Sequence, residues 1–274
     1  SACSRRPQAG TAYANIRRIS ASNVENIMSR LLFMCSGNTC RSPMAAGIAR
    51  RVFGPSHTVM SAGAETGSGE PAAQNAIAAM SKLGVDISSH GTVDIADLDL
   101  ASFDLVIVFR PSAAEDLPIP EAVPVKYLDI TDPHGGSLDV YRAAARLIER
   151  GVRRLYVEDA LRRASLEGVQ PSSHLSGIFN RAAKECEKEI ARFVLSDLHQ
   201  EVNGKATLGQ LATSISVYAV LHSRPDLAKL SAAVAAVNDV WVKVKHRDDP
   251  TAEDLIEGLT AIRRVFELFE QLTA

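Results

Sequence analysis

The chain has 274 residues, of which 46% are apolar and 23% charged, and its formal net charge is −2. This composition excludes a disordered chain, and the length allows one or two domains with real cores. The charge balance lacks the basic excess of a general nucleic-acid binder. The longest uncharged stretch, residues 206–223, is too polar for a membrane span. Four cysteines are too few for a disulfide framework, which favours a cytoplasmic location.

The first 27 residues carry four arginines and one glutamate and lack the apolar stretch of a secretory signal. We expect residues 1–27 to be an N-terminal extension that is either flexible or foreign to the native protein. Met28 directly precedes the first strand-like run and is the expected start of the folded part.

Between residues 28 and 164, short apolar runs alternate with helical patterns. The predicted strands are residues 31–34, 58–60, 105–109 and 123–128, and the predicted helices are residues 43–52, 71–83 and 141–161. Continuous apolar strands separated by helices are typical of a parallel sheet that is covered on both faces. The fold class of this part is therefore α/β, with a parallel sheet sandwiched by helices.

Beyond residue 164 no further strand is predicted. Residues 165–176 contain Gly168 and Pro171 and are interpreted as a linker. Residues 177–274 are predicted to form a separate four-helix domain, because four apolar stripes step by three and four residues. The stripes are Phe179, Ala183, Cys186, Ile190 and Phe193; Leu208, Leu211, Ile215 and Tyr218; Leu230, Val234, Val237, Trp241 and Val244; and Leu255, Leu259, Ile262, Phe266 and Phe269.

The segment from Cys35 to Ser42, hereafter the Cys35 loop, lies between the first predicted strand and the first predicted helix. A helix N-terminus directs backbone N–H groups and a positive dipole end at an anion, and the same field favours the thiolate form of a cysteine. Cys35 is therefore the candidate nucleophile, and Arg41 has the planar fork that holds two phosphoryl oxygens. The predicted phosphate-binding residues are Ser36, Gly37, Asn38, Thr39, Cys40, Ser42 and His134.

Individual loop residues have expected contributions. Gly37 allows the backbone to curl close to a ligand, and Asn38 tolerates a left-handed conformation while bracing the loop with its amide. Ser42 is placed to donate its hydroxyl to the thiolate. A Cys-x5-Arg pattern alone also fits an ordinary strand-to-helix turn, and it is the placement after the first strand that favours phosphate chemistry.

Phosphoryl transfer through a cysteine also needs an acid for the leaving group and later a base for water. Asp132, followed by Pro133, lies in the loop after the fourth predicted strand. The carboxyl ends of parallel strands share one edge of a sheet, so Asp132 is expected to reach the Cys35 loop. The alternatives are a turn or helix-cap role for Asp132, with Asp129 as a less favoured acid.

Residues 31–45 and 132–141, together with Ser61-Ala62-Gly63, resemble the low-molecular-weight protein tyrosine phosphatases over roughly residues 29–160. The resemblance implies that Cys35 attacks phosphorus, Arg41 binds the phosphoryl group, and Asp132 protonates the leaving group and then activates water. It implies no metal or organic cofactor. It also implies that Cys40 can trap Cys35 as a reversible disulfide under oxidation.

Two departures from the tyrosine-specific pattern bear on the substrate. Thr39 stands where a β-branched aliphatic residue is common, and His134 and Gly135 stand where aromatic residues follow the Asp-Pro pair. These features are similar to the protein arginine phosphatase branch. Phosphotyrosine is the default substrate implied by the family, phosphoarginine is the alternative, and a non-catalytic module that recognises a phosphorylated protein is a third reading.

The same fold also serves arsenate reductases, which need further downstream cysteines. The only later cysteine is Cys186, which lies on an apolar stripe and is more simply a core residue. The expected partner is a phosphorylated protein substrate, with no membrane partner. The helical domain is expected to make protein–protein contacts or to form a homodimer.

Overall fold

The computed structural model describes residues 29–64, 66–110, 117–166, 173–196, 198, 206–246 and 251–273. The predicted N-terminal extension and Met28 lie outside these residues. Among the described helices, none is both long enough and apolar enough to cross a bilayer.

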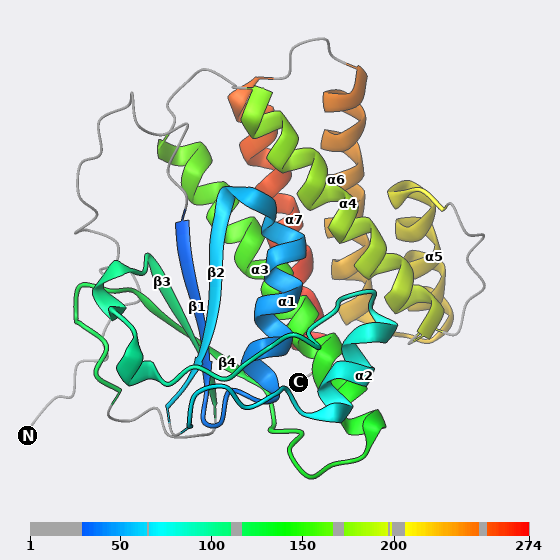
Figure 1. Ribbon diagram of the computed structural model, residues 1–274. Coiled ribbons are helices and arrows are strands. Elements are labelled where there is room, and N and C mark those ends of the chain that lie inside the picture. Colours follow the sequence, from blue (N-terminus) through cyan, green and yellow to red (C-terminus); the bar gives the residue numbers. More distant parts are fainter. Residues whose placement is uncertain are drawn as a thin grey trace, which may run out of the picture.

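Four parallel strands form one sheet (Figure 1). They are β1 (Ser29–Cys35), β2 (His57–Gly63), β3 (Leu105–Arg110) and β4 (Val125–Asp129), and their order in the sheet is β2-β1-β3-β4. Each predicted strand is present, and the parallel pairing of β1 with both β2 and β3 places it in the centre. The carboxyl ends of the strands therefore meet at one edge, as the sequence predicted.

The two faces of the sheet are covered differently. Leu31 and Phe33 of β1 face helices α1 (Arg41–Phe53) and α3 (Leu138–Leu166), because alternate side chains of a strand point to opposite faces. Leu32 and Met34 face the other way, toward the segment that carries two short 3-10 turns, η3 (Ile95–Asp97) and η4 (Leu100–Ser102). The α/β class is confirmed, with short turns rather than long helices over the second face.

The helix bounds differ from the predicted ones, and α1 is slightly longer than predicted at both ends. Helix α2 (Gln74–Lys82) begins three residues later than predicted, because Pro71 forms an isolated bridge with Gly91 and keeps the chain extended there. Helix α3 is longer than predicted at both ends. A short 3-10 turn, η2 (Gly54–Ser56), follows α1 directly.

The C-terminal region is helical, as predicted. Its helices are α4 (Ser173–Ser196), α5 (Leu208–Leu221), α6 (Pro225–His246) and α7 (Ala252–Thr273). Every residue of the four predicted stripes is buried except Tyr218 and Trp241, which are half-buried. Parts of the predicted linker are helical, since residues 165–166 end α3 and residues 173–176 begin α4, while residues 167–172 lie outside the described residues.

One apolar cluster runs from the sheet into the helical region. Helix α3 packs on α1 and α2 on one side and on α4 and α7 on the other (Figure 1). Buried residues of α1, α3 and α4–α7 therefore belong to a single cluster. The division of the chain into two domains stays a prediction. Helix α1 follows the Cys35 loop, helix α3 follows residues 130–137, hereafter the Asp132 loop, and both helices pack into this shared core.

Candidate active site

The Cys35 loop connects the carboxyl end of β1 with the first turn of α1. The residue before α1 is Cys40, and no side chain caps the helix. Pro43 is the third residue of α1, where its missing N–H costs no helical hydrogen bond. The uncapped N-terminus of a thirteen-residue helix thus faces the loop, which is the arrangement that favours a bound anion and a thiolate.

Cys35 is 5% exposed and its Sγ lies 3.0 Å from Oγ of Ser42. Nδ2 of Asn38 donates to the same Ser42 oxygen over 2.8 Å. Because the Ser42 oxygen accepts from Asn38, its own proton is directed away from that bond. The hydroxyl can therefore donate either to the carbonyl of Ala62, 3.4 Å away, or to the nearer Cys35 sulfur when that is a thiolate.

Asn38 is fully buried and holds the loop in a left-handed turn, with φ of 50°. Its Oδ1 accepts the N–H of Val93 over 2.9 Å, and its carbonyl oxygen lies 2.7 Å from Nε2 of His90. Burial lowers the pKa of His90, outweighing the opposing effect of this hydrogen bond. The neutral ring therefore donates its Nε2 proton to the carbonyl. Val93 thus holds the side chain of Asn38, and His90 holds its backbone carbonyl.

The backbone of the loop also lies close to the end of β2. The N–H of Ala64 donates to the carbonyl of Cys35 over 3.1 Å. A Cβ on Gly63 would lie 2.7 Å from the carbonyl oxygen of Ser36, which is closer than any real Cβ contact. Gly63 is therefore required by the approach of the loop to its neighbour.

Arg41 brings the loop after β4 to the Cys35 loop. Its guanidinium is 1% exposed, donates to the carbonyl of Ile130 over 3.2 Å, and contacts Oδ2 of Asp132 at 2.5 Å. The Asp132 side chain is 41% exposed, and its Oδ1 accepts the N–H of His134 over 3.1 Å. Asp129, the alternative acid, is exposed at the end of β4. The structure thus places Asp132 beside Arg41, the predicted phosphate-binding residue.

Cys40, the second cysteine of the loop, points toward α3. Its Sγ lies 3.2 Å from the hydroxyl of Tyr141 and 3.6 Å from Oγ1 of Thr39. Desolvation raises the pKa of the Cys40 thiol and of the Tyr141 hydroxyl. Both groups are accordingly neutral near pH 7, and the disulfide between Cys40 and Cys35 stays a prediction.

The remaining predicted residues differ in their accessibility. Ser36, Gly37 and Thr39 are half-buried in the loop, while His134 is exposed in the Asp132 loop. The sequence analysis missed the contacts of His90 and Val93, because no pattern links that segment to a loop more than 50 residues earlier. It also missed the contact between Tyr141 and Cys40.

Comparison with known proteins identifies the family. The model of the low molecular weight phosphotyrosine protein phosphatase family matches residues 30–167. The chain belongs to this family, with additional helices after the matched region.

Some of the similar proteins are named arsenate reductases and others protein tyrosine phosphatases. Arsenate reductase 2 of Staphylococcus saprophyticus is 35% identical over 127 residues, which are 46% of this chain and 95% of that protein. A probable low molecular weight protein-tyrosine-phosphatase of Ralstonia nicotianae is 32% identical over 137 residues, covering 46% and 92%. The crystal structure of a low molecular weight protein tyrosine phosphatase from T. tengcongensis is 33% identical, has a TM-score of 0.44, and covers 47% of this chain and 99% of that chain.

Proposed function

We propose that the protein is a cysteine-dependent phosphatase that hydrolyses phosphorylated protein side chains, with phosphotyrosine as the preferred substrate. The observation that carries this proposal is the contact between Arg41 and Asp132 beside the loop that holds Cys35. A nucleophile, an anion-binding guanidinium and a carboxyl group, contributed by segments about 90 residues apart, occupy one edge of the sheet.

In the first step, the thiolate sulfur of Cys35 attacks phosphorus and the bond from phosphorus to the leaving oxygen breaks. The Asp132 carboxyl group gives its proton to that oxygen, so the side chain leaves as a neutral alcohol or phenol. Arg41 and the N-terminal amides of α1 stabilise the charge on the phosphoryl oxygens during transfer. Ser42 stabilises the thiolate before attack and after its release.

In the second step, the Asp132 carboxylate accepts a proton from water as the water oxygen attacks the cysteinyl phosphate. The sulfur–phosphorus bond breaks, inorganic phosphate leaves, and Cys35 returns as a thiolate. The same carboxyl group therefore acts as acid and then as base. Its exposure in the structure suits this role, because both the leaving group and water need access to it.

Arsenate reduction is the function named for several relatives, and the position of Cys186 argues against it here. Cys186 is fully buried in α4 within the shared apolar core. Among the described residues its thiol is the only one after the Cys35 loop. A relay of thiols from Cys35 to the surface would need that buried group, whereas phosphate hydrolysis needs only groups already beside the loop.

The choice between phosphotyrosine and phosphoarginine depends on the rim of the site. Thr39 is half-buried beside Cys40, and the exposed residues after Asp132 are His134 and Gly135. The family and the tyrosine-phosphatase relative support phosphotyrosine. The absence of an aromatic residue directly after the Asp-Pro pair keeps phosphoarginine as the alternative to be tested.

The test is phosphate release from matched phosphotyrosine and phosphoarginine peptides by the full chain, with Cys35→Ser as the blank. Arg41→Lys is expected to lose about 10²–10³-fold in kcat/KM, because a lysine cannot hold two phosphoryl oxygens in a fork. If phosphate were released only from the phosphoarginine peptide, and Thr39→Ile shifted the preference to phosphotyrosine, the substrate would be phosphoarginine rather than phosphotyrosine. Binding without release from either peptide would show a recognition module and overturn the catalytic proposal.

A further inference from the structure

A second site rich in arginine lies away from the Cys35 loop, where the C-terminal ends of α1 and α2 meet the sides of α3 and α4. It is a hollow of about 340 Å³, hereafter the cationic hollow. The cationic residues that line it are Arg51, Lys82, Arg153, Arg181, Lys188 and Arg192. Among the described residues, the only acidic side chains that line it are Glu149 and Glu185.

The floor of the cationic hollow is a buried ion network. Glu149, which is 2% exposed, accepts from Arg51, Arg153 and Arg192, each over 2.8 Å. Glu189 lies beneath the floor, is similarly buried, and pairs with Arg150, Arg153 and Arg192. Each of these carboxylates thus serves three arginines, so one negative charge is shared among three positive ones in each case.

The charges of the cationic hollow do not balance. Its lining has an excess of four positive charges, and the pair formed by Arg150 and Glu189 below the floor adds one charge of each sign. Two of the cations also cap helix ends, since Arg51 donates to the carbonyl of Leu83 and Arg181 to that of Phe53. Two helix C-termini supply roughly one negative charge in total, which leaves an excess of about three.

The mouth of the cationic hollow keeps its charges accessible. The side chains of Arg51, Lys188 and Arg192 are 39%, 62% and 37% exposed, and Lys82 is exposed as well. Guanidinium forks and ammonium groups converging from α1, α2 and α4 match the chemistry of phosphate recognition. The volume of the hollow lies at the small end of the range for ligand pockets, about 300–1,000 Å³.

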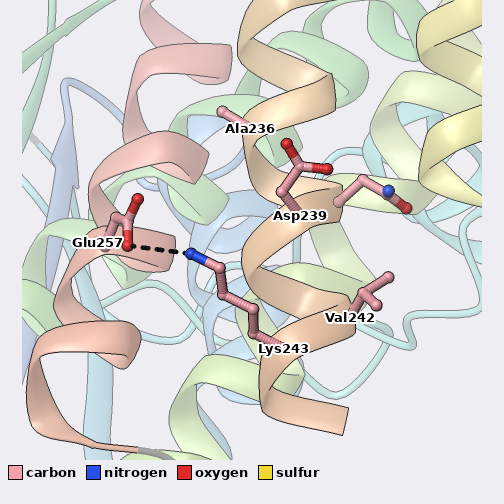
Figure 2. Close-up of a pocket in the computed structure, with 6 residues that line it drawn as sticks. Ala236, Asp239, Val242, Lys243 and Glu257 are labelled. Carbon is pink, nitrogen blue, oxygen red and sulfur yellow. Dashed lines mark ion pairs between the residues drawn. The ribbon is translucent and has the colours of Figure 1, made fainter. Parts of the chain in front are cut away.

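A second hollow shows that this charge excess is not general to the protein. It lies between α6 and α7 and has a volume of about 540 Å³ (Figure 2). Its one cationic residue, Lys243, points toward Glu257 at 4.0 Å, and Asp239 supplies another carboxylate. That hollow therefore has no excess of positive charge to offer an anion.

We propose that the cationic hollow is a binding site for a small polyanion that carries two or more linked phosphates. Lys188 pairs with Glu185 at 2.7 Å, so the two lining carboxylates each have cationic partners, and such a ligand neutralises the net positive charge that remains. It also bridges α1 and α2 to α4. Binding at this position stabilises the contact between the phosphatase part and the C-terminal helices. The inference is independent of catalysis, because none of the six cationic residues belongs to the Cys35 loop.

The test is isothermal titration calorimetry of the full chain with pyrophosphate. The Cys35 loop is itself expected to bind an anion, so the titration is done in an Arg41→Met background that removes the guanidinium from the loop. We expect one pyrophosphate to bind this protein, with an affinity that falls as salt is raised.

Two double variants in the same background decide where pyrophosphate binds. Lys82→Gln with Lys188→Gln removes two exposed cations from the mouth, and it is expected to weaken binding roughly tenfold or more. Lys229→Gln with Lys243→Gln removes the same net charge from α6, which contributes no lining residue to the cationic hollow, and is expected to change affinity less than about twofold. Thermal unfolding of both double variants checks that their folding is unchanged.

Two results would overturn the proposal. One is the absence of binding to the Arg41→Met protein at millimolar pyrophosphate, which would mean that anions bind at the Cys35 loop alone. The other is an equal loss of affinity in the two double variants, which would mean that pyrophosphate responds only to net charge.

Discussion

The Cys35 loop and the cationic hollow both contain a buried arginine, but the two arginines differ in how accessible their carboxylate partners are. Arg41 pairs with Asp132, whose side chain is 41% exposed. Arg153, at the floor of the hollow, is paired with three carboxylates, and both it and Glu149 are almost fully buried. An arginine paired with an accessible carboxylate can exchange that carboxylate for a ligand, whereas an arginine enclosed by buried carboxylates holds helices together.

This difference separates effects on rate from effects on stability. Changes at the Cys35 loop are expected to lower the rate while the protein stays folded. Changes in the buried network are expected to lower stability while the folded protein keeps its rate. The predictions below test each side of that comparison, beginning with the largest effect.

Asp132→Asn is expected to lower kcat by about 10²–10⁴-fold, because an amide cannot give a proton to the leaving oxygen or take one from water. The loss is expected to be smaller for aryl phosphates whose leaving groups need little protonation. Steady-state kinetics on a series of such esters measures both effects. Asp129→Asn is the matched control, and a similar loss in that variant would show that the acid has been assigned to the wrong aspartate.

Arg153→Met is expected to lower the free energy of unfolding by at most about 3–5 kcal/mol, because Glu149 and Glu189 each lose one of three arginine partners while they stay buried. Denaturant unfolding measures this change, and kcat of the folded fraction is expected to be unchanged. The control is Arg142→Met, which removes an exposed pair with Asp139 and is expected to cost less than about 1 kcal/mol. Equal costs in the two variants would contradict a structural role for the buried network.

Gly258→Ala tests apolar packing among the C-terminal helices. A Cβ at this position would lie 2.3 Å from Cε2 of Phe179 and 2.8 Å from Cγ1 of Val240. The expected loss in the free energy of unfolding is about 1–3 kcal/mol, through displaced side chains. Gly177→Ala, in α4 with nothing near its Cβ, is expected to gain roughly 0.5–1 kcal/mol, and a loss there would show that the two positions do not differ in packing.

The sequence predicted the elements whose signals are local. Apolar runs identified each strand of the sheet, and steps of three and four identified the buried faces of the C-terminal helices. The meeting of Asp132 with Arg41 followed from a topological rule, because loops at the carboxyl ends of parallel strands share an edge. The Cys35 loop was recognisable because its residue types and their spacing lie within one short segment.

Contacts between distant polar residues could not be predicted in this way. Glu149, Arg153 and Glu189 are charged residues on helices, and such residues usually face solvent. Their burial depends on how α3 packs against α4, and no periodicity within either helix specifies that packing. The contact of His90 with Asn38 similarly depends on the path of a loop that covers the carboxyl edge of the sheet.

The smallest expected effect is that of His90 titration on the free energy of unfolding. His90 lies beside the Cys35 loop, but we expect it to affect stability rather than rate. Burial lowers its folded-state pKa below the ordinary value of 6.5, so the unfolded chain takes up the proton first as pH falls. Stability is therefore unaffected above about pH 6.5 and decreases below it, until the folded-state pKa is passed. The slope for one group is at most about 1.4 kcal/mol per pH unit.

His90→Gln separates the titration of His90 from its hydrogen bond to Asn38, because glutamine is also a donor but does not ionise in this range. The difference in unfolding free energy between wild type and this variant is expected to change between pH 7 and pH 5, with wild type losing more. Urea unfolding at several pH values measures it. A constant difference across that range would mean that folding does not shift the pKa of His90, which would contradict the effect of burial argued here.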